Sequence, residues 1–353
     1  SGKTTIALHV IEQLLMRGIP AILIDRKGDL VGYAQRAESA SEPERRLRAR
    51  LDVALYTPGD PRGRDLRIAL LPRDAAALPS IERDLIASFC ADALAGMMNY
   101  RTSTRDLACR GIVKKAVELL LEISPSTEIT VESLSGLIEE RDPALLNAVG
   151  HLDPKHYGKL ADDLRVLLLS KERLLKGAGE PLAVEALFGL GPYAVRGKTR
   201  LSIISTKSIG DAQDVEFWIA RLLVELSRWA SRAPSPQLQG VVFFDEADLY
   251  LPAQRKPPTK GPMEDLLKRA RSAGLGILLA TQSPGDLDYK CRDNIRTWLL
   301  GRIKEETAIR KMRPMLGDLR EDLAGLLPTQ GPGEFQVVRD GRAVRMNARE
   351  NIV

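Results

Sequence analysis

The chain opens with Ser1-Gly2-Lys3-Thr4-Thr5, the end of the phosphate-binding pattern G-x-x-x-x-G-K-[ST]. The lysine of this pattern reaches the β- and γ-phosphates of a nucleotide, and the hydroxyl after it ligates Mg²⁺. We therefore expect Lys3 and Thr4 to take these two roles. Ser1, Gly2 and Thr5 would complete the nucleotide-binding loop, whose amides face the phosphates from the start of a helix. The first glycine of the pattern, and the strand before it, are expected to precede Ser1.

The residues after this loop have the pattern of a helix that ends at a glycine. Apolar side chains recur at Ile6, Leu8, Val10, Ile11, Leu14 and Leu15. Arg17-Gly18 follows, and a cation just before a glycine is a common end of a helix. We expect a helix that starts at the phosphate loop and ends before Gly18.

A second stretch, Val241-Val242-Phe243-Phe244-Asp245-Glu246-Ala247, places two acids directly after four apolar residues. The apolar run predicts a buried parallel strand, whose carboxyl end would deliver Asp245 and Glu246 to the site. This is a Walker B pattern, in which the first acid holds the Mg²⁺ shell. We expect Asp245 to take that role, and Glu246 to orient and polarise the attacking water as a general base.

Composition places the chain among soluble globular proteins, since 44% of its 353 residues are hydrophobic and 28% are charged. No apolar run approaches the roughly 20 residues that span a bilayer, and no secretory signal is visible. We therefore expect a cytoplasmic protein without a membrane partner. Cys90, Cys109 and Cys291 are odd in number and lack C-x-x-C spacing, which predicts buried thiols rather than disulfides or a zinc site.

A net charge of +5 and an isoelectric point of about 9.1 permit an anionic partner, although nucleotide alone could satisfy this charge. Aromatic residues make up only 5% of the chain, which gives little support to stacking against single strands. Any contact with a nucleic acid would therefore run through backbone phosphates.

Short apolar segments alternate with helical patterns in both outer parts of the chain. Strands are predicted at 20–25, 52–56, 200–205, 241–244, 276–282, 297–303, 334–338 and 343–346. Helical patterns replace them in the middle, at 81–98, 105–122, 131–140, 157–175 and 182–187. We expect an α/β fold, a RecA-like P-loop NTPase core with a mainly parallel sheet. Segments 1–73 and 192–353 would form the core, and 74–191 an all-helical insertion.

Two further features carry side chains suited to phosphate chemistry. Gln282 ends the strand after the Walker B strand, where its amide either touches the γ-phosphate or the attacking water, or simply starts a loop. The stretch 267–276, L-K-R-A-R-S-A-G-L-G, is a basic helix end that leads into a glycine turn. A guanidinium here could stabilise phosphate charge in a neighbouring subunit, or be only a cation at a helix C-terminus, worth about 0.3–1 kcal/mol.

Together the motifs resemble the HerA branch of the HerA/FtsK superfamily of hexameric, DNA-translocating ATPases. They are S-G-K-T-T at 1–5, D-R-K-G-D-L at 25–30, F-F-D-E-A at 243–247, R-A-R-S-A-G-L-G at 269–276, A-T-Q-S-P at 280–284 and P-G-E-F-Q-V-V at 332–338. The resemblance implies Arg271 as an arginine finger acting in trans, with Arg269 as the second candidate. It also implies Asp25 as a supporting acid near the nucleotide. The chain departs from many relatives in reading D-R-K-G-D where they carry proline and a glutamate, and the N-terminal barrel of archaeal members is not in this sequence.

The resulting expectation is an ATP- and Mg²⁺-dependent motor that forms a homo-oligomeric ring, a hexamer by resemblance, and moves along or pumps double-stranded DNA. One alternative is an ATP-dependent scaffold or switch that assembles a nuclease or an anti-phage defence complex. Another is a conjugative coupling or secretion ATPase, although such proteins usually bring membrane segments. DNA-stimulated hydrolysis and salt-sensitive DNA binding would separate a motor from a scaffold.

A candidate DNA contact follows the Walker B strand at 251–261, L-P-A-Q-R-K-P-P-T-K-G. The segment is proline-rich, basic and almost free of apolar side chains, which predicts an exposed loop. Arg255, Lys256 and Lys260 could meet phosphates there without reading bases, if the loop faces the pore of a ring. The alternative is a surface loop without a partner.

Overall fold

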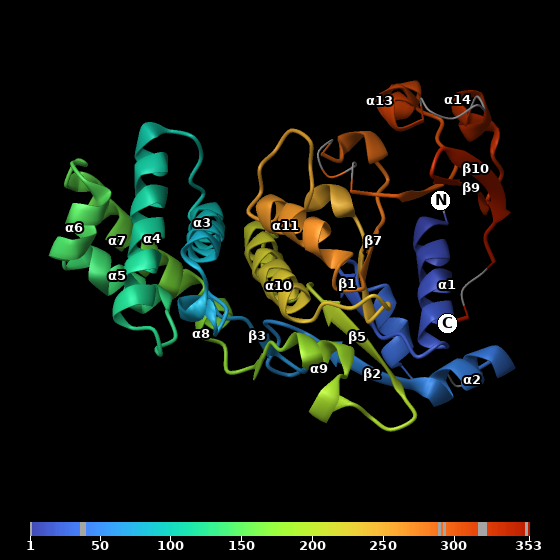
Figure 1. Cartoon of the computed structure of the whole chain (residues 1–353), viewed down its shortest axis with the longest axis horizontal. Helices are drawn as coiled ribbons and strands as arrows, with labels where there is room; N and C mark the ends of the chain where they lie inside the picture. Colours follow the sequence, from blue (N-terminus) through green and yellow to red (C-terminus); the bar gives the residue numbers. More distant parts are fainter. Residues whose placement is uncertain (1, 36–39, 289–290, 292–293, 317–322, 350–351) are drawn as a thin grey trace.

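The computed structural model describes residues 2–35, 40–288, 291, 294–316, 323–349 and 352–353. Its centre is a five-stranded parallel sheet in the order β2-β5-β1-β6-β7 (Figure 1). The strands are β1 (Ala21–Asp25), β2 (Leu51–Tyr56), β5 (Thr199–Ser205), β6 (Gly240–Phe244) and β7 (Leu275–Leu279). Ile24 of β1 lies opposite Phe244 of β6. The acids that follow these two residues therefore emerge at the same edge of the sheet.

Two hydrophobic cores cover the two faces of this sheet. Successive side chains of a strand point to opposite faces, so Ile22 and Ile24 join one core and Leu23 joins the other. Helices α9 (Val184–Phe188), α10 (Ala212–Arg232) and α11 (Lys260–Ala270) contribute to the first core, and α1 (Lys3–Leu15) and α2 (Glu42–Arg50) to the second. The predicted α/β fold with a parallel, helix-covered sheet is confirmed.

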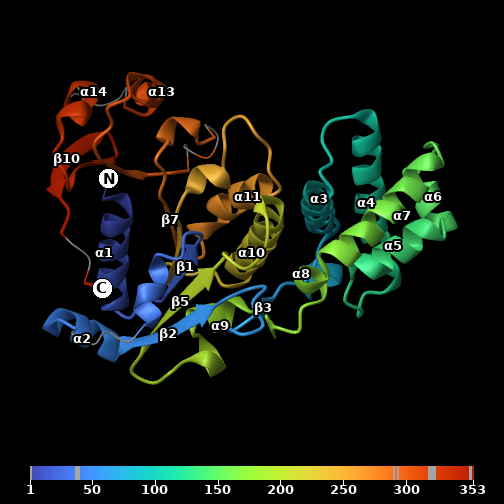
Figure 2. The ribbon, with the colours of Figure 1, turned by 180° about the vertical axis from the view of Figure 1, so that it is seen from behind.

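The middle of the chain is helical and packs against the rest through α3. Its helices are α3 (Ser80–Met97), α4 (Thr104–Ile123), α5 (Val131–Glu139), α6 (Pro143–Val149), α7 (Lys155–Ser170) and α8 (Glu172–Lys176). Helix α3 lies between α10 and α4 (Figure 2) and contacts both. One hydrophobic core includes residues of all three helices. Among the helices of the described residues, none combines the length and the apolarity needed to cross a membrane.

Three elements of the region 74–191 differ from the expected all-helical insertion. Helix α6 and strand β4 (Glu180–Pro181) were not predicted, and helix α9 lies against the central sheet. Helix α6 escaped prediction, although Asp142 caps it and Pro143 starts it, which are helix-start signals. The two-residue strand β4 (Glu180–Pro181) pairs with β3 (Leu66–Arg67), and so short a strand has no period to recognise. Helix α9 packs on β5 of the central sheet.

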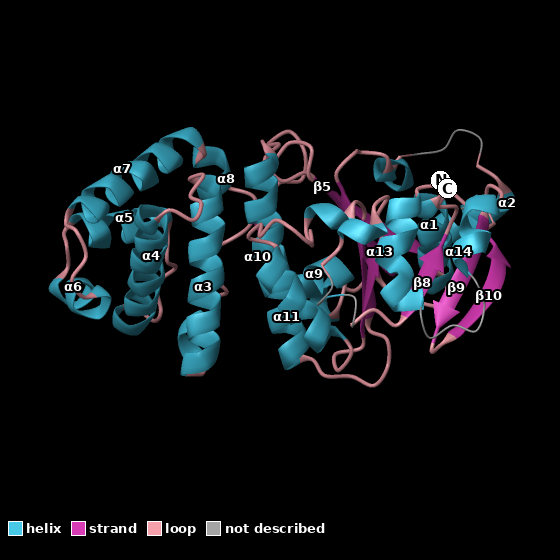
Figure 3. Cartoon of the chain, turned by 90° about the horizontal axis from the view of Figure 1, so that it is seen from above, coloured by secondary structure: helices cyan, strands magenta, loops and turns pink. Residues whose placement is uncertain are grey.

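The predicted strands near the end of the chain form a separate antiparallel sheet, in the order β10-β9-β8, instead of extending the parallel one. They are β8 (Thr297–Leu300), β9 (Glu334–Arg339) and β10 (Arg342–Asn347). Asp340 and Gly341 have φ values of 49° and 71°. Two positive φ angles are the geometry of a tight hairpin turn, which forces β9 and β10 to be antiparallel. Figure 3 shows this sheet beside α1, at the end of the molecule opposite to the helical segment.

Helices α13 (Glu306–Leu316) and α14 (Leu323–Leu326) pack on this small sheet around a third hydrophobic core. The end of the described chain then returns to α1 (Figure 1). The amides of Ile352 and Val353 donate hydrogen bonds to the carboxylate of Glu12, a fully buried residue of α1, at 2.7–3.1 Å. The hydroxyl of Tyr33 donates to the same carboxylate at 2.8 Å. The phosphate-loop helix is therefore held by segments from both ends of the chain.

Candidate nucleotide-binding site

The phosphate loop enters α1 through a left-handed residue. Gly2, at φ 69° and ψ 5°, is the N-cap of α1, so the amides of Lys3, Thr4 and Thr5 precede the hydrogen-bond ladder of the helix. Within the described residues, no side chain caps this helix and no acid lies in its first turn. A helix start with free amides and no competing acid fits a bound phosphate. Ser1, also predicted to bind nucleotide, lies outside the described residues.

The structure brings the two nucleotide motifs into contact. The hydroxyl of Thr4 donates a hydrogen bond to Oδ2 of Asp245 across 3.4 Å, although 241 positions separate the two residues. Asp245 follows β6 directly, and the strand delivers it to the edge of the sheet where α1 begins. Hydroxyl and carboxylate oxygens are ligands that Mg²⁺ accepts, and one or two protein ligands suffice where substrate phosphates and water supply the rest. The two side chains therefore fit the predicted metal site.

Glu246 has an unusual backbone conformation, left-handed at φ 54° and ψ 47°. A side chain makes this region costly, by roughly 1–2 kcal/mol, and such strain gathers at functional sites. The turn is held by the neighbouring strand, because the amide of Ala247 donates to the carbonyl of Ala280 and the amide of Ala280 donates to that of Phe244. This fixed turn places the Glu246 side chain at the carboxyl edge of the sheet, next to Asp245.

The carboxylate of Glu246 forms an ion pair with Lys27, whose Nζ lies 2.8 Å from Oε1. Both partners remain partly accessible, with 46% of the Lys27 side chain and 23% of the Glu246 side chain exposed. The hydrogen bond to Glu246 raises the pKa of Lys27, so the amine is charged at neutral pH. Sequence reasoning missed Lys27, although it lies in the quoted motif at 25–30. The available signal was a cation two positions after a core strand that ends at the same edge of the sheet as the Walker B strand.

Lys3 shares this site with the same charges. Burial lowers the pKa of Lys3, and the nearby Lys27 acts in the same direction, against the carboxylates of Asp245, Asp248 and Glu246. The phosphate-loop lysine, the second lysine and the acids are therefore close enough to influence one another. A triphosphate bound at this loop would meet two ammonium groups.

Asp25, predicted as a supporting acid near the nucleotide, has a different task in the structure. It ends β1, is 2% exposed, and accepts hydrogen bonds from the amides of Gly28 at 2.6 Å and Leu30 at 3.1 Å. Burial raises the pKa of Asp25, against the effect of those hydrogen bonds. Both carboxylate oxygens are committed to the backbone of the loop after β1. Asp25 therefore shapes the loop that carries Lys27.

Gln282 lies three positions beyond the end of β7, with an exposed side chain that has no hydrogen-bond partner in the described part of the chain. Its neighbour Thr281 donates a 2.6 Å hydrogen bond to Asp248, in the turn after the Walker B strand. The backbone before Gln282 is thus fixed relative to that turn. Its amide is free to contact a ligand.

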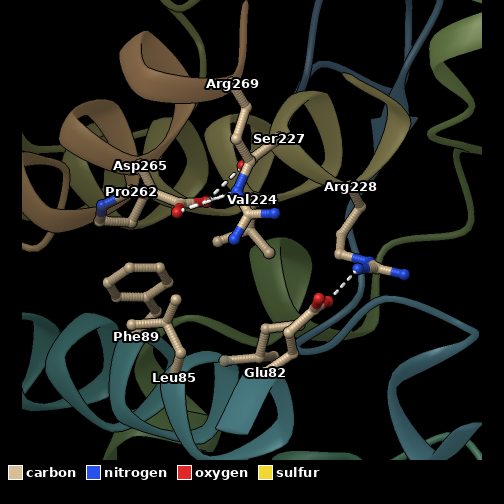
Figure 4. Close-up of a pocket in the computed structure, with 10 residues that line it drawn as sticks. Glu82, Leu85, Phe89, Val224, Ser227, Arg228, Pro262, Asp265 and Arg269 are labelled. Atoms are coloured by element: carbon tan, nitrogen blue, oxygen red, sulfur yellow. Dashed lines mark hydrogen bonds and ion pairs between the residues drawn. The ribbon is translucent and has the colours of Figure 1, made fainter. Parts of the chain in front are cut away.

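The two candidate arginines of α11 differ in their surroundings. Arg269 bonds both carboxylate oxygens of Asp265 through Nε, at 3.0 and 3.1 Å, and donates from Nη1 to the hydroxyl of Ser231 at 2.9 Å. It lines a small pocket between α3, α10 and α11, which Figure 4 shows together with Asp265 and the Arg228–Glu82 ion pair. Arg269 therefore joins α11 to α10, and its guanidinium is already occupied.

Arg271 is the exposed C-cap residue of α11, and it makes no side-chain hydrogen bond or ion pair with any residue that the structure describes. The residue lies four positions before Leu275, the first residue of β7, which pairs with Gly240 at the amino edge of the sheet. Asp245 and Glu246 lie at the carboxyl edge, about 16 Å away along a five-residue strand. Arg271 therefore lies near the amino edge of the sheet, away from the acids at its carboxyl edge.

The segment 251–261 is less exposed than its composition predicts. Leu251, Pro252, Pro257 and Thr259 are buried, and the exposed part consists of 254–256. Leu251 is fully buried in the main core. Thr259 is anchored by a 2.9 Å hydrogen bond from its hydroxyl to the carbonyl of Tyr250. Proline and threonine side chains contribute apolar surface that a count of strongly hydrophobic residues overlooks.

The three predicted DNA contacts in this segment also differ. Lys260 starts α11, forms an ion pair with Asp288, and donates to the carbonyl of Pro252 at 3.0 Å. The amine therefore already has two acceptors, and its role as a phosphate contact stays a prediction. Arg255 is exposed and lies 3.5 Å from Glu216, while Lys256 is exposed. Only these two cations are open to a partner.

The whole fold is similar to solved structures of VirB4 and of a bacterial conjugative coupling protein. VirB4 of Thermoanaerobacter pseudethanolicus matches with a TM-score of 0.65 and 16% identity, over 99% of this chain and 86% of that chain. The unbound bacterial conjugative coupling protein TrwBΔN70 matches with a TM-score of 0.61 and 13% identity, over 100% of this chain and 83% of that chain. TrwB in complex with the non-hydrolysable GTP analogue GDPNP matches with a TM-score of 0.54 and 14% identity, over 100% of this chain and 76% of that chain.

No family model and no curated protein matches the chain. At such low identities the likeness to VirB4 and TrwB establishes the fold alone. The central parallel sheet, with the phosphate loop and the Walker B acids at its carboxyl edge, is that of a RecA-like P-loop NTPase.

Proposed function

We propose that the chain is a Mg²⁺-dependent P-loop ATPase of the FtsK/HerA type, which forms a homo-oligomeric ring and moves along or pumps double-stranded DNA in the cytoplasm. The proposal is carried by the contact between Thr4 and Asp245, which joins the phosphate loop to the Walker B strand and leaves Glu246 beside both. The complex of TrwB with GDPNP supports it, since a protein of the same fold takes a nucleoside triphosphate analogue.

Each side chain at the site has a role that its position supports. Lys3 and the loop amides bind the phosphates. Thr4 and Asp245 would hold Mg²⁺, which when bound neutralises part of the phosphate charge. Glu246 orients and polarises the attacking water, and Gln282 contacts the γ-phosphate or that water.

Arg271 completes the site of the neighbouring subunit. Its exposed guanidinium lies at the amino edge of the sheet, where it can project from one molecule toward the nucleotide of the next. An arginine supplied in this way stabilises charge on the transferred phosphate. Hydrolysis would then depend on assembly of the ring, which is a hexamer in the family that the motifs resemble.

The experiment that tests the function is the rate of ATP hydrolysis by the full-length protein with and without long duplex DNA, across a range of salt concentrations. A DNA motor should be stimulated by duplex DNA, and the stimulation should fall as salt rises because phosphate contacts release counterions. A rate that ignores DNA at every salt concentration would favour a scaffold that assembles a nuclease or defence complex.

The fold of TrwB, a bacterial conjugative coupling protein, favours a second candidate, a conjugative coupling or secretion ATPase. The two candidates differ in what the purified protein can do alone. A free motor displaces a third strand from duplex DNA without any partner, whereas a coupling ATPase requires the machinery that it serves. Strand displacement by the isolated protein decides between them.

A further inference from the structure

Lys27 lies at the site, but the proposed hydrolysis gives it no role. The contacts of Lys27 suggest what that role is. The backbone around Lys27 is held in place, because the amides of Gly28 and Leu30, which follow Lys27, donate hydrogen bonds to the carboxylate of Asp25, which precedes it. Gly28 has φ 81°, and a β-carbon there would lie 2.3 Å from Nζ of Lys207. The loop is therefore tied to Asp25 and passes close to the Lys207 side chain. The long side chain of Lys27 can move its charge without a change in this backbone.

The partner of this charge is the residue that the proposed chemistry needs. Lys27 contacts Glu246 at 2.8 Å and has no other hydrogen bond or ion pair in the described part of the chain. The ion pair occupies the carboxylate that the proposed chemistry needs for orienting water. Glu246 is thus engaged as long as Lys27 stays with it.

The position of Lys27 also puts its charge near the end of a bound triphosphate. Lys27 influences Lys3, the residue that reaches β- and γ-phosphates in this motif. The carboxylates around Lys27 are those of Glu246, Asp245 and the exposed Asp29. A γ-phosphate carries more charge than one carboxylate and would compete with Glu246 for the same ammonium group.

We infer that Lys27 is a γ-phosphate contact that exchanges partners: it holds Glu246 in the nucleotide-free site and transfers to the γ-phosphate when ATP binds. The exchange frees Glu246 to act on water only when a triphosphate is present. The inference rests on the proposed ATPase function and adds to it a distinction between ATP and ADP. A diphosphate has no γ-phosphate to draw Lys27 away, so Glu246 would remain paired.

Binding measurements on the full-length protein test the exchange without relying on turnover. Lys27→Ala should weaken a non-hydrolysable ATP analogue by about 10-fold or more, the value of a charge-assisted hydrogen bond, and leave ADP affinity unchanged. Lys27→Arg should restore most of the loss. Lys207→Ala removes another exposed lysine, which follows β5 and lies beside Gly28 without an ion pair to Glu246, and should change neither affinity.

Acylation of lysine amines, read by mass spectrometry, gives an independent result on the unsubstituted protein. The ATP analogue should protect Lys27, while ADP should not, and Lys207 should react equally in all samples. In the absence of nucleotide, Glu246→Gln should make Lys27 more reactive, because its partner has lost its charge.

The outcomes separate this inference from the function on which it rests. If the unsubstituted protein binds neither nucleotide, both are overturned. If it binds both, but Lys27→Ala weakens ATP analogue and ADP equally or not at all, the exchange is overturned and the ATPase assignment stands. Equal protection of Lys27 by the analogue and ADP would also overturn it.

Discussion

At the scale of single residues, the site depends on a few side chains whose positions are set by backbone that the sequence motifs do not mention. Thr4 and Asp245 meet because a helix start and a strand end share one edge of the sheet. Glu246 occupies a left-handed turn that two backbone hydrogen bonds to the next strand hold in place. Residues other than glycine rarely adopt this left-handed conformation. We therefore infer that the carboxylate of Glu246, and not its backbone preference, explains why a glutamate stands here.

We expect Glu246→Gln to retain ATP binding and to hydrolyse ATP at least about 10²-fold more slowly, the lower range of a general base contribution. The amide keeps the shape of the side chain and loses the ability to accept a proton from water. Single-turnover hydrolysis and nucleotide binding, measured on the same preparation, check the two halves of this expectation.

Lys3→Ala is the matched comparison, since it should weaken nucleotide binding itself. Hydrolysis by Glu246→Gln at the rate of the unsubstituted protein would show that the water is activated by another group.

At the scale of elements, the sequence predicted best where a pattern is long or chemically specific. Strands β1, β5 and β6 and helices α3, α4 and α5 appear close to their predicted bounds, because apolar period and turn residues agree. The separate sheet could not be foreseen from composition, since the direction of β9 and β10 depends on the two positive φ angles at 340–341. The ion pair of Lys260 with Asp288 could not be predicted either, because packing brings the two residues together, whereas Arg269 and Asp265 lie four positions apart on one helix.

Arg269→Ala should lower stability rather than catalysis. It removes the link from α11 to α10 through Asp265 and Ser231, which for a partly exposed ion pair is worth about 1 kcal/mol. Thermal unfolding of Arg269→Ala, beside Lys268→Ala as an exposed neighbour, measures the loss. A stable Arg269→Ala that has lost hydrolysis would move the finger assignment to this residue.

The loop after the Walker B strand offers two cations for DNA. Neutralising Arg255 and Lys256 together should lower affinity for all DNA sequences alike and reduce the slope of log K against log salt by up to about two units. ATP hydrolysis without DNA should persist. Binding titrations at several salt concentrations measure the slope, and an unchanged slope would place the DNA contact elsewhere.

Lys260→Ala belongs in the same series as a structural comparison. Its ion pair with Asp288 is largely buried, with 13% and 12% of the two side chains exposed. The substitution should lower stability and leave the salt slope as it was.

At the scale of the whole molecule, the parallel sheet puts its phosphate chemistry at one edge and Arg271 at the other. The sequence predicted both ends of this arrangement, because each is a short motif, but the distance between them is a property of the folded sheet. The choice of Arg269 or Arg271 as the candidate arginine finger therefore depends on where the fold places each side chain. The guanidinium of Arg269 is bound within its own chain, and Arg271 is exposed near the amino edge of the sheet.

A complementation experiment tests this arrangement. Arg271→Ala should fold and bind nucleotide but lose about 10³-fold or more in hydrolysis, the value of an arginine finger. Glu246→Gln should be equally inactive for a different reason. In rings that contain both variants, some sites combine an intact Glu246 from one subunit with an intact Arg271 from its neighbour, so mixing should restore part of the activity. Recovery should follow the proportion of mixed neighbours as the ratio of the two variants changes. If co-assembly is verified and no activity returns at any ratio, Arg271 does not act between subunits.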